Sequence, residues 1–200
     1  MKRFAAIGFD RGGVITNRSG INFNQQVCDI TGVSLENYKT AYYNHSRELI
    51  IDNISATEMW RRVLTDLHKV QYLGEVLNLV NMPKTFDEEV IQVIKELKGK
   101  GYKVGLLSND SKESACRMRK LEHLDELFSV MLVSGETGYA KPTKEAYIDF
   151  CNKLGISPWE LLFVDDSELN LDGGVELGIT TILYKNPNQL RATLKDLEIL

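Results

Sequence analysis

Short apolar runs alternate with longer amphipathic segments along most of this 200-residue chain, and that alternation constrains its fold most strongly. Each run is brief, rich in branched or aromatic residues, and closed by polar residues or glycine, as expected of buried strands. The expected strands are residues 4–9, 102–107, 129–133, 161–164 and 180–184. Strands separated by helices in this way predict an α/β fold, a doubly wound parallel sheet with helices on both faces.

One region breaks this rhythm, because residues 19–83 contain four helical patterns in succession and no convincing strand. We interpret it as an all-helical cap inserted after the first strand, where it would cover the carboxyl edge of the sheet. The expected organisation is therefore an α/β core of residues 1–18 and 84–200, with residues 19–83 as the cap.

Composition narrows the possible partners. The hydrophobic fraction of 43% is sufficient for a core, and a net charge of -4 without a basic block argues against nucleic acid. No segment approaches the roughly 18 apolar residues that a membrane span needs. Three widely spaced cysteines favour reduced core thiols, so we expect a cytoplasmic protein with no membrane partner. The sequence leaves a monomer and a homodimer equally open.

Polar residues of complementary chemistry follow four of the expected strands. They are Asp10, then Ser108 and Asn109, then Lys141, and finally Asp165 and Asp166. Because ligands of doubly wound sheets bind at the carboxyl ends of the strands, we expect these side chains to form one site.

This set of residue types suits phosphoryl transfer. A carboxylate such as Asp10 can take up a phosphoryl group covalently, and Asp165 and Asp166 can join it in holding Mg²⁺, which favours carboxylate oxygens. Lys141 can neutralise phosphate charge, and Ser108 can donate a hydrogen bond to a phosphate oxygen. Positioning and charge stabilisation supply most of the catalysis in such reactions.

The same residues carry a resemblance to a known family. The segments FDRGGVI, LLSND, GYAKP and FVDDSELNLDGGVELG resemble, in order, the four motifs of the haloacid dehalogenase (HAD) superfamily. The helical insertion between the first two motifs is similar to the small cap of its phosphatase-like and dehalogenase-like branches. The resemblance covers nearly the whole chain and implies a Rossmann-like core.

The resemblance also implies roles for individual residues. Asp10 would be the nucleophile, Ser108 would bind the phosphoryl group with the Asn109 backbone or amide nearby, and Lys141 would bridge nucleophile and phosphate. The implied Mg²⁺ ligands are Asp10, the main-chain carbonyl of Gly12, Asp166 directly, and Asp165 directly or through water. Asn170 would brace the loop that carries the acidic pair.

The chain departs from the family pattern at Gly12. The common phosphatase motif is Asp-x-Asp, whose second carboxylate acts as general acid and base, and proton transfer of this kind contributes about 10²- to 10⁴-fold. Strand alternation points Arg11 away from Asp10, and guanidinium is a poor acid. His45 in the expected cap is a candidate replacement, weighed against an ordinary structural histidine.

Three neighbours of His45 on the same cap helix are further candidates for substrate contact. They are Tyr42, Tyr43 and Arg47.

The sequence thus predicts a Mg²⁺-dependent phosphatase that hydrolyses a small phosphorylated metabolite, with sugar phosphates as one candidate class. Two alternatives stay open. A 2-haloacid dehalogenase would resemble Asp-x-Tyr-Gly at its first motif, so Gly12 and the Asp165–Asp166 pair argue against it. A weakened phosphate-binding or regulatory protein would follow if the absence of an acid at Gly12 abolishes turnover.

Overall fold

The computed structural model describes residues 3–16, 23–51, 54–82, 84–120 and 123–200. Five parallel strands form one sheet in the order β3-β2-β1-β4-β5. The strands are β1 (Ala6–Phe9), β2 (Lys103–Ser108), β3 (Val130–Val133), β4 (Leu161–Asp165) and β5 (Thr180–Leu183). All five predicted strands are present, and the predicted parallel α/β sheet is confirmed.

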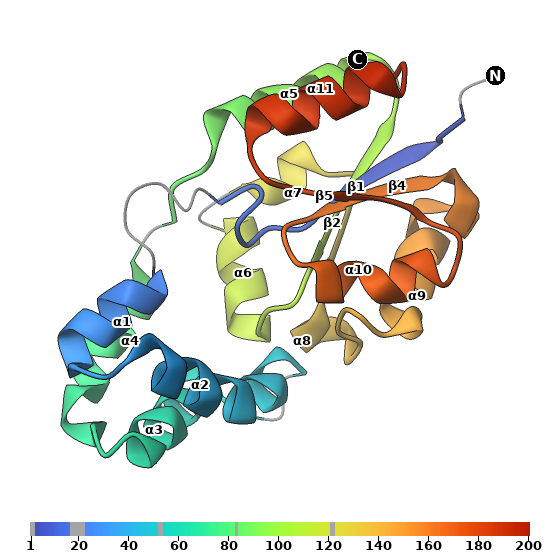
Figure 1. Cartoon of the computed structure of the whole chain (residues 1–200). Helices are drawn as coiled ribbons and strands as arrows, with labels where there is room; N and C mark the ends of the chain where they lie inside the picture. The colour runs from blue at the N-terminus through green and yellow to red at the C-terminus, as the bar shows by residue number, and fades with distance from the viewer. Residues whose placement is uncertain (1–2, 17–22, 52–53, 83, 121–122) are drawn as a thin grey trace.

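Helices cover both faces of the sheet, as Figure 1 shows, with α5 and α11 on one side and α9 and α10 on the other. The helices of the core are α5 (Glu88–Gly99), α6 (Lys112–Lys120), α7 (Leu124–Leu127), α8 (Ser134–Thr137), α9 (Lys144–Leu154), α10 (Glu168–Val175) and α11 (Pro187–Asp196), with a short 3-10 turn η2 (Pro158–Glu160) before β4.

Alternation along the strands explains the two layers. Ile7 and Phe9 of β1 pack in the same apolar cluster as α5 and α11, whereas Ala6 packs with α9 on the opposite face. In β4, Leu162 and Val164 join the first cluster and Phe163 the second. A strand buried on both faces has no polar face, which is why these segments appear in the sequence as continuous apolar runs.

Four helices between β1 and α5 form a separate lobe, which we call the cap. They are α1 (Phe23–Thr31), α2 (Leu35–Ile50), α3 (Ala56–Asp66) and α4 (Leu73–Asn81), with a 3-10 turn η1 (Val70–Tyr72). The cap has its own apolar cluster, in which Trp60 stacks on Tyr38 with ring centroids 6.4 Å apart. In Figure 1 the cap lies at the lower left, next to α6 and α8 of the core.

The two segments that connect the cap to the core lie side by side. Thr16 and Phe86 form an isolated antiparallel bridge, and the amide of Asp87 donates to the carbonyl of Ile15 at 2.9 Å. The exact domain boundaries, with a cap of residues 19–83, stay a prediction, because residues 17–22 and 83 lie outside the described part of the chain.

Two findings bear on the predictions from composition. No helix within the described ranges is long and apolar enough to cross a membrane. All three cysteines are free thiols, with Cys28 and Cys151 buried. The prediction of three core thiols is wrong for Cys116, which is exposed on α6 because it lies on the face of that helix opposite the buried Ala115 and Met118.

Candidate active site

The carboxylate of Asp10 lies at the carboxyl end of β1, between β2 and β4, where the order of the strands along the sheet reverses. Its amide donates to the carbonyl of Val164 at 2.8 Å, so Asp10 is held against β4 as the last residue of the ladder. The chain then turns sharply, with the carbonyl of Arg11 accepting from the amides of Ile15 and Thr16, and Gly13 has a positive φ of 82° that favours glycine. The turn carries the chain off the sheet immediately after Asp10.

A buried ammonium group occupies the centre of the site. The Nζ atom of Lys141 lies 2.6 Å from Oδ1 of Asp10 and 2.6 Å from Oδ2 of Asp165, and the lysine side chain has no exposed area. Asp10 and Lys141 are 131 residues apart in sequence. The structure therefore brings together the acid after β1, the lysine between β3 and β4, and the acid at the end of β4.

The backbone of Lys141 is clamped by Asn109. The Asn109 side chain donates to the carbonyl of Lys141 at 2.8 Å and accepts from the amide of Lys141 at 2.8 Å. Both ends of this amide group are therefore used in positioning the lysine. Sequence reasoning missed this clamp, because it joins two loops 32 residues apart.

Helix α10 packs against the loop that contains Lys141 and Pro142. A Cβ atom on Gly173 would lie 1.7 Å from the carbonyl oxygen of Pro142, so no other residue allows this approach of helix to loop. The first turn of α10 also braces Asp165, because Asn170 Nδ2 lies 3.2 and 3.3 Å from its two carboxylate oxygens. The amide of Ser167 donates to Asp165 Oδ1 at 2.9 Å.

Three carboxylates meet at this edge of the sheet. Asp10, Asp165 and Asp166 each offer an oxygen atom, and these atoms lie within 4.8 Å of one another, a spacing that a metal ion could bridge. Ser108 is buried as the last residue of β2, whose Leu106 pairs with Phe9, so it lies on the strand next to Asp10. The predicted site residues thus lie together.

The charges of the site are unbalanced. Burial, together with the charges of Asp165 and Asp166, raises the pKa of the Asp10 carboxyl from its ordinary value of 3.8 to about 6, against the opposing effect of Lys141. Burial alone would lower the pKa of Lys141, but the charges of Asp10 and Asp165 outweigh it and raise that pKa above its ordinary value. Lys141 is therefore a permanent cation, and the carboxylates outnumber it.

Gly12 leaves an open position beside Asp10. Gly12 is exposed, and a Cβ atom there would meet only Oδ2 of Asp10, at an ordinary contact distance of 3.8 Å. A Cβ atom at position 12 would therefore lie next to the Asp10 carboxylate without displacing its neighbours. The carbonyl oxygen of Gly12 is kept whatever the side chain.

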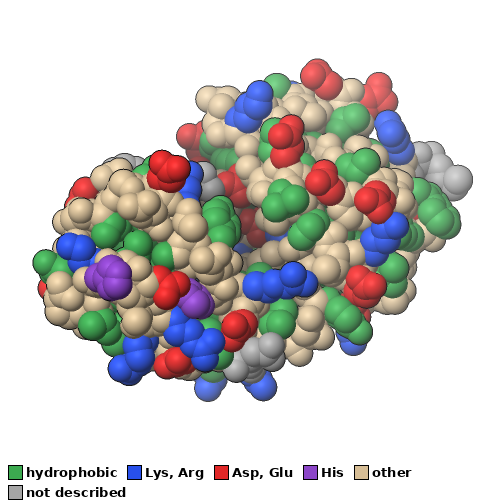
Figure 2. Space-filling view, turned by 60° about the horizontal axis from the view of Figure 1, so that its bottom comes forward, with side chains coloured by type: hydrophobic (Ala, Val, Ile, Leu, Met, Phe, Trp, Pro, Cys, Tyr) green, Lys and Arg blue, Asp and Glu red, His purple; other side chains and the backbone are tan. Residues whose placement is uncertain are grey.

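A cleft of about 270 Å³ lies between the cap and the core, next to these residues. Figure 2 shows the hollow between the two lobes. Its core side includes Arg11 and Asp110, whose Nη1 and Oδ2 atoms form an ion pair at 3.5 Å. Sequence reasoning did not assign either residue to the site, although Arg11 follows Asp10 and Asp110 follows Asn109.

The cap candidates divide between the cleft and the outer surface. Tyr42 lines the cleft, and burial together with Asp110 raises its pKa to about 12, so the phenol stays protonated. Tyr43 and Arg47 do not line it, and Tyr43 is 69% exposed. His45 bonds to Asp66 of α3 at 2.7 Å within the cap and is also absent from the lining, so the structure gives no support to a proton-transfer role for it.

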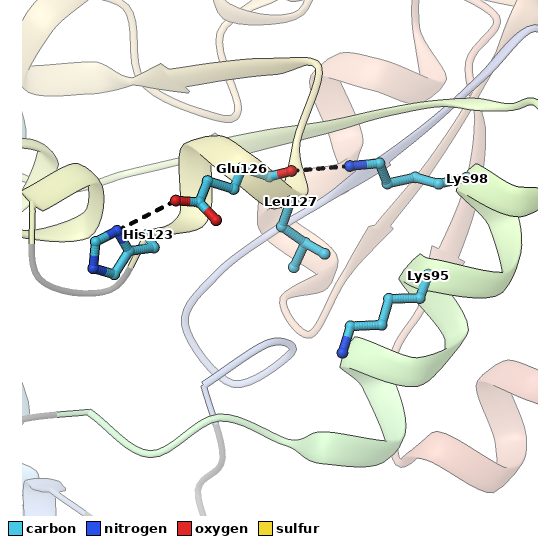
Figure 3. Close-up of a pocket in the computed structure, with 5 residues that line it drawn as sticks. All are labelled: Lys95, Lys98, His123, Glu126 and Leu127. Carbon is cyan, nitrogen blue, oxygen red and sulfur yellow. Dashed lines mark hydrogen bonds and ion pairs between the residues drawn. The ribbon is translucent and has the colours of Figure 1, made fainter.

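A second hollow, of about 440 Å³, lies between α5 and α7 (Figure 3). It is lined by Lys95, Lys98, His123, Glu126 and Leu127. Lys98 Nζ donates to the carbonyl of Glu126 at 3.0 Å, and His123 Nδ1 lies 3.5 Å from the Glu126 carboxylate. None of the candidate catalytic residues lines this hollow, so we place the chemistry at the carboxylate cluster.

Comparison with known proteins identifies the family. The family model for haloacid dehalogenase-like hydrolases matches residues 4–178. The chain belongs to this hydrolase family. It is 30% identical to phosphatase MT3486 of Mycobacterium tuberculosis over 98% of this chain and 94% of the relative. It is 33% identical to pyrophosphatase PpaX of Bacillus cereus over 47% of this chain, which is 44% of that protein.

Solved structures of this hydrolase family share the fold. The magnesium complex of HAD family enzyme BT-2542 from Bacteroides thetaiotaomicron superimposes with a TM-score of 0.72 at 23% identity, covering 92% of this chain and 94% of that chain. A dehalogenase superimposes with a TM-score of 0.68 at 20% identity, covering 90% and 84%. At these identities the likeness concerns the fold alone.

Proposed function

We propose that this hydrolase is a Mg²⁺-dependent phosphatase that cleaves a small phosphate monoester through an aspartyl-phosphate at Asp10. The observation that carries the proposal is the buried Lys141 ammonium, 2.6 Å from both Asp10 and Asp165, with Asp166 completing a cluster of three carboxylates. The phosphatase names of the full-length relative and of PpaX support it.

The donor set fits a magnesium ion. Carboxylates and a main-chain carbonyl are hard oxygen ligands, and a divalent cation would offset the negative charge of the three carboxylates, which adds to burial in raising the pKa of Asp10. The ligands would be Asp10, the Gly12 carbonyl, Asp166 directly, and Asp165 directly or through water. The oxygens of Asp165 already accept from Lys141, Ser167 and Asn170, which supports Asp166 as the direct ligand. A bound Mg²⁺ supplies charge neutralisation at the phosphate oxygens.

The side chains can carry out a two-step transfer. An Asp10 oxygen attacks phosphorus while the bond to the ester oxygen breaks, and the leaving alkoxide takes a proton to depart as an alcohol. Water then attacks phosphorus, loses a proton, and releases inorganic phosphate and the free Asp10 carboxylate. Lys141 has three N–H donors, of which two meet Asp10 and Asp165, so one can donate to the phosphoryl group. Ser108 would donate another hydrogen bond.

Proton transfer is the step for which this chain lacks the usual group. The position beside Asp10 holds Gly12, and Arg11 and Tyr42, which line the cleft, are poor acids near neutral pH. The lining also contains the carboxylates of Asp110, which pairs with Arg11 at 3.5 Å, and of Glu113 on α6, and neither occupies the position of the usual acid two residues after the nucleophile. We therefore expect solvent water to exchange these protons, with turnover slower than that of a relative with an acid at this position.

The dehalogenase alternative finds less support in the site. Dehalogenation by attack on a carbon atom needs no metal ion. Asp10, Asp165 and Asp166 instead concentrate negative charge around one lysine, which favours binding of a metal cation. The third alternative, a phosphate-binding protein with little turnover, differs from our proposal only in rate. The experiment must therefore measure turnover and compare it with a nucleophile variant.

Phosphate release from a panel of monoesters and pyrophosphate, with Mg²⁺ and with a chelator, tests the proposal. We expect Mg²⁺-dependent release by the wild type, and a fall of about 10⁴-fold or more in kcat for Asp10→Asn, because the nucleophile is removed. Asp196→Asn, an exposed acid at the end of α11, is the matched control and should retain activity. Equal rates for the wild type and Asp10→Asn would refute the proposal.

A further inference from the structure

We infer that the cleft between cap and core selects phosphate monoesters whose leaving group carries a single compact aromatic ring. The inference rests on the proposed phosphatase activity and adds a substrate class to it. It is drawn from the side chains that the cap presents to the cleft, from the placement of the core side next to Asp10, and from the volume between them.

The cap side of the cleft is an aromatic and aliphatic wall. Trp60 is its centre, with ring centroids 5.8 Å from Phe23 and 5.7 Å from Tyr42. The remaining apolar residues of the lining are Leu49, Ala56, Met59 and Val80. Aromatic rings pack well against such a surface in offset or edge-to-face arrangements, which add to the gain from apolar burial.

The cap offers few groups to a sugar. Among its described lining residues, only Tyr42, Trp60 and Asn81 carry polar side-chain atoms, and the Asn81 carbonyl oxygen accepts from Arg117 at 3.3 Å. A hydroxyl that packs against this wall loses its hydration without regaining a hydrogen bond from it, which costs free energy for each unpaired group. The polar side chains on the core side can pair only with hydroxyls that face them. An aromatic leaving group has no such loss.

The core side of the cleft places the reacting ester. Arg11 directly follows Asp10, and Asp110 and Ser111 follow the Ser108–Asn109 segment, and these three residues line the cleft. A phosphoryl group at Asp10 would therefore point its ester oxygen into the cleft, with the leaving group facing the cap. Outside the cap helices, Lys84, Glu113, Ser114 and Arg117 also line the cleft, so its polar side chains face an apolar wall formed by the cap.

The volume of the cleft limits the leaving group to one ring. An apolar cavity of roughly 150 Å³ in a protein holds benzene. The cleft of about 270 Å³ therefore holds a ring with a linker or small substituents.

The experiment compares three esters of primary alcohols, whose leaving oxygens differ little in reactivity: benzyl phosphate, ethyl phosphate and glucose 6-phosphate. With Mg²⁺ present, we expect kcat/KM for benzyl phosphate to exceed that for each of the other two esters by roughly tenfold or more. Binding a small apolar group in a matching pocket changes kcat/KM by about this factor. Ala56→Phe, which fills the cleft, should lower the benzyl-to-ethyl ratio by a similar factor.

Thr57→Phe is the matched control, because Thr57 is exposed next to Ala56 and does not line the cleft, so the ratio should not change. Val80→Phe fills the cleft from α4 and replaces Ala56→Phe if that variant does not fold.

Mg²⁺-dependent turnover without a preference for benzyl phosphate, or with glucose 6-phosphate preferred, would overturn this inference and leave the proposed function standing. A benzyl preference that Ala56→Phe and Val80→Phe leave intact would also overturn it. Absence of Mg²⁺-dependent release from all three esters and from the wider panel would instead refute the phosphatase proposal itself.

Discussion

At the scale of single residues, Asp10 acquires its chemistry from partners that are distant in sequence. An aspartate after a strand is usually a turn or cap residue, but here burial and two further carboxylates raise its pKa to about 6 while Lys141 holds it in place. Above that pH the carboxylate is ionised and nucleophilic. The neighbouring Gly12 contributes a carbonyl group and no acidic side chain. The nucleophile therefore lacks a proton-transfer group at position 12.

Restoring an acid at position 12 tests whether proton transfer limits the rate. Gly12→Asp places a carboxyl group beside Asp10, where the nearest atom to the new Cβ is at 3.8 Å, so it should fit. We expect kcat to rise by about tenfold or more, within the range that general acid–base groups contribute. The rise should be largest for substrates with poor leaving groups, and steady-state kinetics measure it.

Gly12→Asn is the control, because it has the same size and no ionisable proton. If Gly12→Asn matches Gly12→Asp, the gain comes from local structure and the account of the missing acid is wrong.

At the scale of elements, α10 and the loop before α9 act as one unit. Gly173 allows α10 to contact the Pro142 carbonyl, and Asn170 from the same helix holds Asp165. Asn109, at the end of β2, fixes the backbone of Lys141 from the other side. Lys141 is therefore positioned by contacts from two elements, and it needs no movement to reach Asp10.

Gly173→Ala should separate these elements. The added Cβ would lie 1.7 Å from a backbone oxygen, so α10 or the loop must shift. We expect a loss of about 1–3 kcal/mol in the free energy of unfolding, and a fall of roughly 10²-fold in kcat as Lys141 is displaced. Denaturant unfolding and steady-state kinetics measure the two effects.

The matched substitution is Gly99→Ala in the last turn of α5, where nothing lies within 4 Å of the new Cβ. It should leave both quantities unchanged or slightly raise stability. Equal behaviour of the two variants would show that the contact between α10 and Pro142 does not position the site.

At the scale of the whole molecule, the ionised carboxylate of Asp10 lowers the free energy of unfolding when no metal is bound. The folded state raises the pKa of Asp10 above its unfolded value, so the folded protein binds this proton more tightly. Stability from this group is therefore fully present below about pH 4 and is lost as the pH rises through about 6.

Asp10→Asn removes this titration. In the presence of a chelator, the free energy of unfolding of the wild type should fall by about 1–3 kcal/mol relative to that of Asp10→Asn as the pH rises from 4 to 7. Added Mg²⁺ should raise the Tm of the wild type at pH 7.5 and have a smaller effect on Asp10→Asn, because a ligand is missing. A difference between the two proteins that does not vary with pH would contradict this account of the site.

Much of this architecture could be predicted from the sequence. Continuous apolar runs identified all five strands, because a strand buried on both faces carries a strong signal. The acids and the lysine at strand ends could be grouped, because a parallel sheet collects its carboxyl ends at one edge. The clamp of Asn109 on Lys141 could not be predicted, since it depends on how two irregular loops meet.

The cap was less predictable for a related reason. An amphipathic helix shows which side is apolar but not whether that side faces its own lobe or a cleft. Tyr42 and Tyr43 are adjacent in sequence, and only Tyr42 lines the cleft. His45 was a reasonable candidate by its chemistry, but its contact with Asp66 is formed by tertiary structure within the cap.

The central claim, covalent catalysis by Asp10, is tested most directly by trapping the intermediate. Wild-type protein turning over the best substrate of the panel is quenched in acid and reduced with borohydride, which converts an aspartyl-phosphate to homoserine, and its peptides are analysed by mass spectrometry. Our account predicts homoserine at position 10 and unaltered aspartate at positions 165 and 166. Turnover with unmodified Asp10, or with the phosphoryl group on another side chain, would contradict it.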